Sequence, residues 1–273
     1  MDAVNIPRDL REVLDDAWEA TKKVPGFLGE DEARFLGMVA ACTPGHGSIV
    51  EIGSFKGKST VMLAKVSKHY GLGPVVAIDP HNFNAPKIES YRKWSTSVTT
   101  YEEILENLRI AGVSELVDVR RAYSTEVSAT WNSPIRFLWI DGDHSYQGVK
   151  ADFDGFYRHL MPHGVVAFHD ALHEYSGPIR VFAEDVLSSP KFGPSGFVSS
   201  IAWSQFRPED GDLFQEQRSR LERAAARIIP FVKDDLELRG LRKILFKLNR
   251  SLVPRTLMQP QDWALLLNPS KPR

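Results

Sequence analysis

Short apolar runs alternate with helix-periodic segments through the middle of this 273-residue chain. Five runs rich in β-branched and aromatic residues predict buried strands, at 48–52, 75–78, 116–119, 135–140 and 165–168. The segments between them have helical spacing, at 58–70, 101–111, 147–160 and 179–187. Strands that alternate with helices predict an α/β fold, a mostly parallel sheet with helices on both faces, and 197–206 predicts an antiparallel pair beside it.

Chemically distinctive residues come directly after four of these expected strands. They are Gly53, Asp79, Asp141 and the pair His169-Asp170. The carboxyl ends of parallel strands meet at one edge of a sheet, and ligands bind there. We therefore expect a functional site that gathers these residues.

The first expected strand ends in the turn Glu51-Ile-Gly-Ser-Phe-Lys-Gly-Lys-Ser59, which opens a helix. A P-loop needs four residues between its glycines, but Gly53 and Gly57 are separated by three. A dinucleotide fingerprint needs glycine where Phe55 stands. The adenosine half of S-adenosylmethionine has no pyrophosphate and tolerates this spacing, and Asp79 can accept hydrogen bonds from two ribose hydroxyls. A plain structural turn with a solvated aspartate is the remaining alternative.

Aspartates and histidines gather in the segments 140–146 and 168–170. If these segments end adjacent strands, five side chains converge: Asp141, Asp143, His144, His169 and Asp170. Carboxylates with imidazole and water suit Mg²⁺ or Mn²⁺, and the single cysteine, Cys42, excludes a cysteine-based zinc site. An imidazole also titrates near neutrality, so a histidine here suits proton transfer. The alternative is that Asp143, His144 or Ser145 only caps the next helix.

Four segments carry a resemblance to a known family: IVEIGSFKGKST, VVAID, FLWIDGDHSYQGVKADF and LMPHGVVAFHD. Over roughly 46–206 the chain resembles class I S-adenosylmethionine-dependent methyltransferases, most of all the metal-dependent sugar O-methyltransferases of macrolide and polysaccharide synthesis. More weakly, it is similar to the sugar 1-O-methyltransferases of methylmannose polysaccharide synthesis. The resemblance implies a Rossmann-like, seven-stranded, mostly parallel sheet, with S-adenosylmethionine and Mg²⁺ or Mn²⁺ as cofactors. It implies O-methylation of a sugar or glycoside, with a mannoside in methylated polysaccharide synthesis as the narrower expectation.

The resemblance also implies roles for individual residues in binding S-adenosylmethionine. The methionine and ribose of the cofactor would lie along Gly53, Ser54 and Ser59, with Glu51 beneath them. Asp79 would hold the ribose hydroxyls. Tyr123 and Ser124 would flank the adenine, although many relatives carry an acidic residue at position 123. Asp143 is placed in the cofactor-binding group as well.

The resemblance also implies which residues bind the metal and which residue acts as the general base. Asp141, His169 and Asp170 match metal ligands, although relatives often carry glutamate where His169 stands. His144 matches the general base. Two other classes remain open: a metal-dependent hydroxylase-like relative, and a catalytically silent S-adenosylmethionine-binding module.

The net charge of −1 conceals two regions of opposite charge. Residues 1–206 carry 20 basic and 26 acidic side chains, a net of −6, and residues 207–273 carry 14 and 9, a net of +5. This balance argues against a nucleic-acid binder, and a small-molecule or oligosaccharide acceptor is expected. We expect N-terminal helices in 1–45, the methyltransferase core in 46–206 and a helical extension in 207–273.

The extension predicts helices at 213–227 and 236–248. The second is basic and has one leucine stripe: Leu238, Leu241, Leu245 and Leu248. We expect this stripe to pack on the core or on a twin subunit, giving a homodimer, with weak contact to an anionic membrane as the alternative. The single cysteine and the lack of a signal-like or spanning segment predict a cytoplasmic protein. Residues 80–100, with Phe83, Tyr91 and Trp94, suggest a lid over a sugar.

Overall fold

The computed structural model describes residues 6–82, 99–233, 238–255, 260, 261 and 263. Its centre is a seven-stranded sheet in the order β3-β2-β1-β4-β5-β7-β6. The strands are β1 (Ser48–Ile52), β2 (Val75–Ile78), β3 (Val117–Arg120), β4 (Ile135–Ile140), β5 (Leu160–Phe168), β6 (Phe192–Val198) and β7 (Ile201–Phe206). Strands β1 to β5 are parallel, whereas β7 runs antiparallel to both β5 and β6. The predicted α/β fold with a mostly parallel sheet is therefore confirmed.

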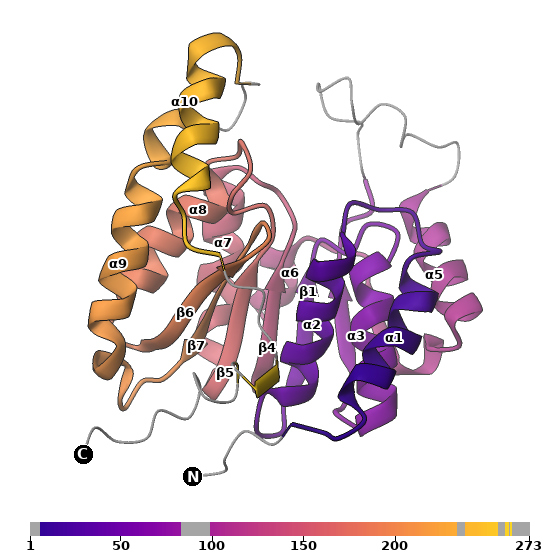
Figure 1. Ribbon diagram of the computed structural model, residues 1–273. Coiled ribbons are helices and arrows are strands. Elements are labelled where there is room, and N and C mark those ends of the chain that lie inside the picture. Colours follow the sequence, from indigo (N-terminus) through magenta and orange to yellow (C-terminus); the bar gives the residue numbers. More distant parts are fainter. Residues whose placement is uncertain (1–5, 83–98, 234–237, 256–259, 262, 264–273) are drawn as a thin grey trace.

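Helices cover both faces of the sheet (Figure 1). On one face lie α1 (Leu10–Thr21), α2 (Glu30–Cys42), α3 (Lys58–Tyr70) and α5 (Thr100–Ala111). The other face carries α7 (Tyr146–Phe156), α8 (Gly177–Val181) and α9 (Gln215–Ala226), with the short α6 (Ser124–Ser128) beside α7.

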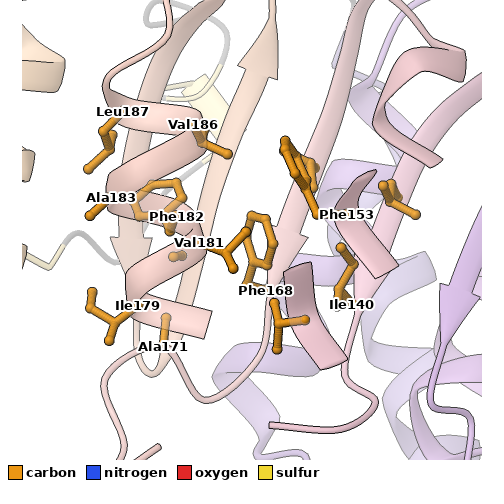
Figure 2. Close-up of a cluster of buried hydrophobic side chains, with 14 of the residues drawn as sticks. Ile140, Phe153, Phe168, Ala171, Ile179, Val181, Phe182, Ala183, Val186 and Leu187 are labelled. Carbon is orange, nitrogen blue, oxygen red and sulfur yellow. The ribbon is translucent and has the colours of Figure 1, made fainter. Parts of the chain in front are cut away.

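Alternate residues of each strand enter opposite cores, as the two-residue repeat of a strand requires. In β4, Phe137 and Trp139 join the core under α1–α3, whereas Leu138 and Ile140 join the core under α7–α9. Figure 2 shows this second core, where Phe168 at the end of β5 lies between Phe153 and Phe182. The buried strand ends therefore hold the residues that follow them in fixed positions.

The structure differs from the sequence prediction around β5. We expected a helix to 160 and a strand from 165, but α7 ends at Phe156 and β5 begins at Leu160. Ile135 pairs with Leu160 and Phe137 with Val165, so the residues between Leu160 and Val165 bulge out of the ladder. The Met-Pro-His-Gly sequence has the pattern of a turn, and in the structure it forms this bulge, in which His163 has a positive φ of 67°.

The C-terminal leucine stripe was expected to pack on the core or on a twin subunit, and packing on the core is wrong for most of its members, whereas packing on a twin subunit stays a prediction. Helix α10 (Gly240–Ser251) packs through Phe246, which is 1% exposed, whereas Leu241 is 70% and Leu248 57% exposed. The helix has apolar residues on two faces, and periodicity alone does not show which face is buried. Leu238, before the helix, is buried as expected. No helix among the described residues is long and apolar enough to cross a membrane, and the suggested lid residues Phe83, Tyr91 and Trp94 lie outside the described part.

Candidate functional site

The turn after β1 is packed against the turn after β4. The amide of Gly53 donates to the carbonyl of Ile78 at 2.8 Å, and the amide of Asp141 donates to the carbonyl of Ile52 at 2.8 Å. Gly53 has a φ of 88°, and a Cβ atom there would collide with the carbonyl of Asp141. The backbone geometry and the close approach both require glycine.

Replacing Gly53 by alanine should therefore destabilise the fold by about 3 kcal/mol or more, because strain and collision add. Gly112 is the matched control, since its φ is 68° but nothing lies within 4 Å of an added Cβ. Gly112→Ala should cost about 1 kcal/mol, the ordinary penalty for a left-handed residue. Urea unfolding measures the loss in the free energy of unfolding for each variant. Equal losses for Gly53→Ala and Gly112→Ala would contradict the close packing proposed for the turn.

Asp79 ties this turn to the end of β2. Its two carboxylate oxygens accept hydrogen bonds from the backbone amides of Phe55, at 2.8 Å, and His81, at 2.6 Å. Beside it the hydroxyl of Ser54 is buried and has no hydrogen-bond partner among the described residues. A buried polar group usually has a partner, so this hydroxyl is available to a ligand bound at the turn.

Glu51 lies under the turn and is fully buried. Its carboxyl group accepts hydrogen bonds from the hydroxyls of Ser59 and Thr60, which connect β1 to the first turn of α3. Burial raises the pKa of Glu51 to about 7, against the lowering effect of these two hydrogen bonds.

This raised pKa predicts a pH dependence of stability. Between about pH 4.5 and pH 7 the folded state binds more protons at Glu51 than the unfolded state does. The free energy of unfolding should fall as pH rises through this window, by about 3 kcal/mol at most. Urea unfolding at pH 5 and pH 8 should show that Glu51→Gln gains stability relative to the wild type at the higher pH. Glu115→Gln, at an exposed position, is the control, and parallel pH profiles for wild type and Glu51→Gln would contradict the prediction.

The residues expected near the adenine already have partners in the chain. Tyr123 is 54% exposed, and its hydroxyl accepts a hydrogen bond from Asn82 at 2.8 Å. The hydroxyl of Ser124 donates to Asp152, whose pKa burial raises to about 6.

At the start of α7 the structure shows the helix cap that the sequence offered as an alternative to a functional role, with Ser145 as the capping residue. Asp143 accepts hydrogen bonds from the amide of Ser145 at 3.0 Å and from its hydroxyl at 2.9 Å. The side chain of Ser145 in turn accepts from the amide of Gly148 at 3.1 Å and caps the helix. Cofactor roles for Asp143, Tyr123 and Ser124 stay predictions.

The ends of β4 and β5 bring the expected aspartates and histidines together. Nδ1 of His169 lies 2.9 Å from Oδ1 of Asp141 and 3.7 Å from Oδ1 of Asp170. Nε2 of His144 lies 3.3 Å from Oδ2 of Asp170 and 3.7 Å from Oδ1 of Asp141. We call these four residues the Asp/His cluster.

The spacing within the cluster fits a bound divalent cation. One ligand atom each from Asp141, His144 and His169 lies within 4.8 Å of the others. Two ligand atoms that bind an octahedral cation at about 2.1 Å lie about 3 Å apart. The distances of 2.9–3.7 Å in the cluster are close to this value. The donor atoms are carboxylate oxygens and imidazole nitrogens, with no thiolate.

Electrostatic coupling within the cluster is strong. Burial lowers the pKa of the His144 imidazole, but Asp170 and Asp141 raise it by more, so the net shift is upward. The pKa of His169 is likewise raised well above its ordinary value by Asp141 and Asp170, against burial. The pKa of Asp170 is lowered because His169 and His144 outweigh the effect of burial. The histidines and carboxylates therefore stabilise one another's charged forms.

Glu32 is a member of the site that sequence reasoning missed. It projects from α2, and its Oε2 lies 3.3 Å from Nε2 of His169. Its Oε1 accepts hydrogen bonds from the amide and hydroxyl of Ser200, at 3.2 and 2.6 Å. Burial raises the pKa of Glu32, but the hydrogen bond and the charge of His169 lower it by more, so the pKa falls to about 2. The available signal was a glutamate four residues before Leu36, on the apolar face of an amphipathic helix.

Three other side chains surround the cluster. The ring of Tyr175 lies 4.6 Å from that of His144, and Nδ1 of His173 lies 3.5 Å from Oδ1 of Asp170. Arg250 reaches the same region from α10. Its Nε is buried with no hydrogen-bond partner among the described residues, and its pKa is lowered by burial against the influence of Asp170, Glu174 and Glu32. The sequence patterns gave no indication that Arg250 lies near the cluster.

Comparisons with known proteins concern the fold and residues 50–171. Residues 50–171 match the model of a methyltransferase domain family. A protein assigned as an O-methyltransferase in Klebsiella pneumoniae shares the fold with a TM-score of 0.50 at 15% identity, over 75% of this chain and 92% of that one. TomG of Streptomyces achromogenes, an O-methyltransferase of tomaymycin synthesis solved with S-adenosylmethionine, has a TM-score of 0.50 at 17% identity, over 75% and 92%.

A viral relative matches part of the chain. An uncharacterized protein of Acanthamoeba polyphaga mimivirus is 27% identical over 121 residues, which are 44% of this chain and 50% of that protein. The chain thus spans about half the length of that relative. The motifs that carry the methyltransferase resemblance lie largely within the matched residues 50–171, and the solved structures share the fold.

Proposed function

We propose that this chain, which carries a methyltransferase domain over residues 50–171, is an S-adenosylmethionine-dependent O-methyltransferase that uses a divalent cation. The observation that carries the proposal is the contact between the glycine turn and the Asp/His cluster. Gly53 packs against the carbonyl of Asp141, and the side chain of Asp141 faces both histidines. A methyl donor at the turn and an acceptor at the cluster would therefore be neighbours.

The turn provides the features that the donor requires. S-adenosylmethionine supplies an electrophilic methyl group on its sulfonium. We assign Gly53, Ser54 and Asp79 to its binding, because Gly53 makes the sharp turn after β1 with a φ of 88° and the Ser54 hydroxyl lacks a partner among the described residues. Glu51 and Ser59 support the turn from beneath through their mutual hydrogen bond.

His144 is the proposed general base. A hydroxyl group is almost fully protonated at neutral pH, so it needs a proton acceptor to become a good nucleophile. An imidazolium formed by uptake of this proton would be stabilised by Asp170 and Asp141, which lie 3.3 and 3.7 Å from Nε2. The His144 side chain is 26% exposed, and Nε2 itself is buried.

The proposed cation ligands are Asp141, His169 and Asp170. A divalent cation supplies a Lewis acid for the oxygens of the acceptor. A hydrogen bond from Nε2 of His169 to Glu32, across 3.3 Å, leaves the lone pair of Nδ1 directed at the cluster. A site that contains an imidazole as well as carboxylates favours a first-row transition-metal ion such as Mn²⁺. Mg²⁺ prefers a site in which every ligand atom is oxygen.

The acceptor class is inferred from the sequence motifs. The segments DGDHSY and HD resemble those of sugar O-methyltransferases, so we propose a hydroxyl of a sugar or glycoside, and more narrowly a mannoside. Two neighbouring hydroxyls on one ring match a site with several oxygen and nitrogen donors. We also propose a cytoplasmic location, from the single buried Cys42.

A screen of glycosides and other hydroxylated acceptors with isotopically labelled S-adenosylmethionine tests this proposal. We expect label to enter a glycoside in the presence of Mn²⁺ and not in the presence of EDTA. A silent binding module would bind the donor and transfer label to no acceptor. A hydroxylase-like relative would modify an acceptor without consuming the donor.

A further inference from the structure

Helix α10 presents an apolar stripe to solvent. The stripe consists of five residues spaced like one face of a helix, with exposures from 37% to 70%: Leu241, Ile244, Leu245, Leu248 and Leu252. These are half of the ten large hydrophobic side chains exposed among the described residues. A concentration of this kind on one helix marks an interaction surface.

The stripe is not needed to attach the helix to the protein. Phe246 and Val253, on the opposite side, are buried in the core under α7–α9. Arg242 also donates from Nε to the carbonyl of Phe231 at 3.0 Å. Further along the chain, Trp263 is fully buried against Phe35 and Trp203, at 5.8 and 4.5 Å between ring centroids. The chain therefore returns to the other core after α10, and Trp263 does not cover the stripe.

The charged side chains of the helix and its flanking residues are all basic. Residues 238–255 contain six arginines and lysines and no aspartate or glutamate. With 100° between successive helical residues, Arg242 and Lys247 lie on opposite flanks of the stripe. Arg242 is held by its hydrogen bonds to the carbonyls of Phe231 and Pro230, whereas Lys247 is exposed and can extend beside the leucines towards a negatively charged surface.

The helix lies at the edge of the sheet that carries the Asp/His cluster. Nζ of Lys243 is 3.3 Å from Oε1 of Glu174, and the amide of Leu238 donates to Oε2 of the same residue at 3.1 Å. Glu174 follows His173, which contacts Asp170. Figure 1 shows α10 extending beyond the end of the sheet on the side of α8 and α9.

We propose that the α10 stripe binds an anionic membrane surface, with the helix in the plane of the headgroups and the edge that holds the Asp/His cluster beside the bilayer. The leucines would enter the boundary of the acyl chains, and the flanking cations would attract acidic headgroups. A second copy of this chain fits less well, because two such helices would bring basic flanks together without an acidic residue in either helix to pair with them. The proposal is independent of methyl transfer and adds to the proposed function.

Vesicle sedimentation of the full chain tests this proposal. At low salt we expect binding to vesicles of phosphatidylglycerol and phosphatidylcholine, at least tenfold weaker binding to phosphatidylcholine alone, and weakening by added salt. The double variant Leu241→Glu/Leu248→Glu should bind the anionic vesicles at least tenfold more weakly. Both positions are solvent-exposed, so circular dichroism should show an unchanged fold. Leu213→Glu is the matched control, since Leu213 is 69% exposed but lies outside α10, and it should bind like the wild type.

Three results would overturn the proposal. One is the absence of sedimentation with anionic vesicles, and another is equal binding by the wild type and the double variant. The third is light scattering that shows a dimer for the wild type and a monomer for the double variant, which would mean that the stripe binds a second copy of the chain. Failure of methyl transfer would change none of these readouts.

Discussion

Replacing His144 by alanine should lower the turnover number by about 10²- to 10⁴-fold, the usual contribution of a general base. Nε2 of His144 is held 3.3 Å from Asp170, and its imidazolium form is stabilised there, so its removal leaves the acceptor hydroxyl without a proton acceptor. The affinity for S-adenosylmethionine should be unchanged, because the glycine turn does not depend on this side chain. Steady-state kinetics with calorimetry of donor binding measures both quantities.

Two controls separate the base from other roles of His144. His46→Ala removes an exposed histidine that precedes β1 and should turn over normally. Mn²⁺ binding should survive in His144→Ala if the imidazole is the base, and should be lost if His144 is mainly a ligand. Normal turnover in His144→Ala would remove the residue from the mechanism.

Asp170→Asn should cost at least about 10³-fold in turnover, because the cation then loses a charged ligand. Asp170 has a φ of 53°, a conformation that asparagine also tolerates, so the substitution preserves the backbone. Excess Mn²⁺ should restore activity to the wild type after treatment with EDTA but not to the variant. Turnover measured before and after chelation gives the comparison.

The control for this prediction is Asp143→Asn. Asp143 is a nearby carboxylate that is exposed and bonded to Ser145, so in Asp143→Asn excess Mn²⁺ should restore the activity lost to EDTA, as it does in the wild type. Rescue of Asp170→Asn by Mn²⁺, to the same degree as Asp143→Asn, would contradict the assignment of Asp170 as a ligand.

The strands and the residues at their ends were predictable from sequence because the signal is local. A buried parallel strand is a short β-branched run, and the rule that parallel strands end at one edge brings Gly53, Asp79, Asp141 and His169 together. The bulge within β5 was missed because Met-Pro-His-Gly has the local pattern of a turn, whereas the pairing of Leu160 with Ile135 is a long-range contact.

The parts that were missed depend on tertiary packing. Glu32 meets His169 across 137 positions of sequence, and nothing near Glu32 indicates that contact. Arg250 reaches the cluster only because α10 packs through Phe246. The same choice of packing face leaves Leu241 and Leu248 in solvent, which periodicity could not decide.

Binding of Mn²⁺ to the full chain, followed by electron paramagnetic resonance, is the most direct test of the cation site on which the mechanism depends. We predict one bound ion per chain in the wild type and in Asp143→Asn, and at least tenfold weaker binding in Asp141→Asn. Asp141 has this role because its carboxylate faces both His144 and His169. Absence of Mn²⁺ binding by the wild type, or equal affinity in Asp141→Asn, would contradict the cation-assisted mechanism.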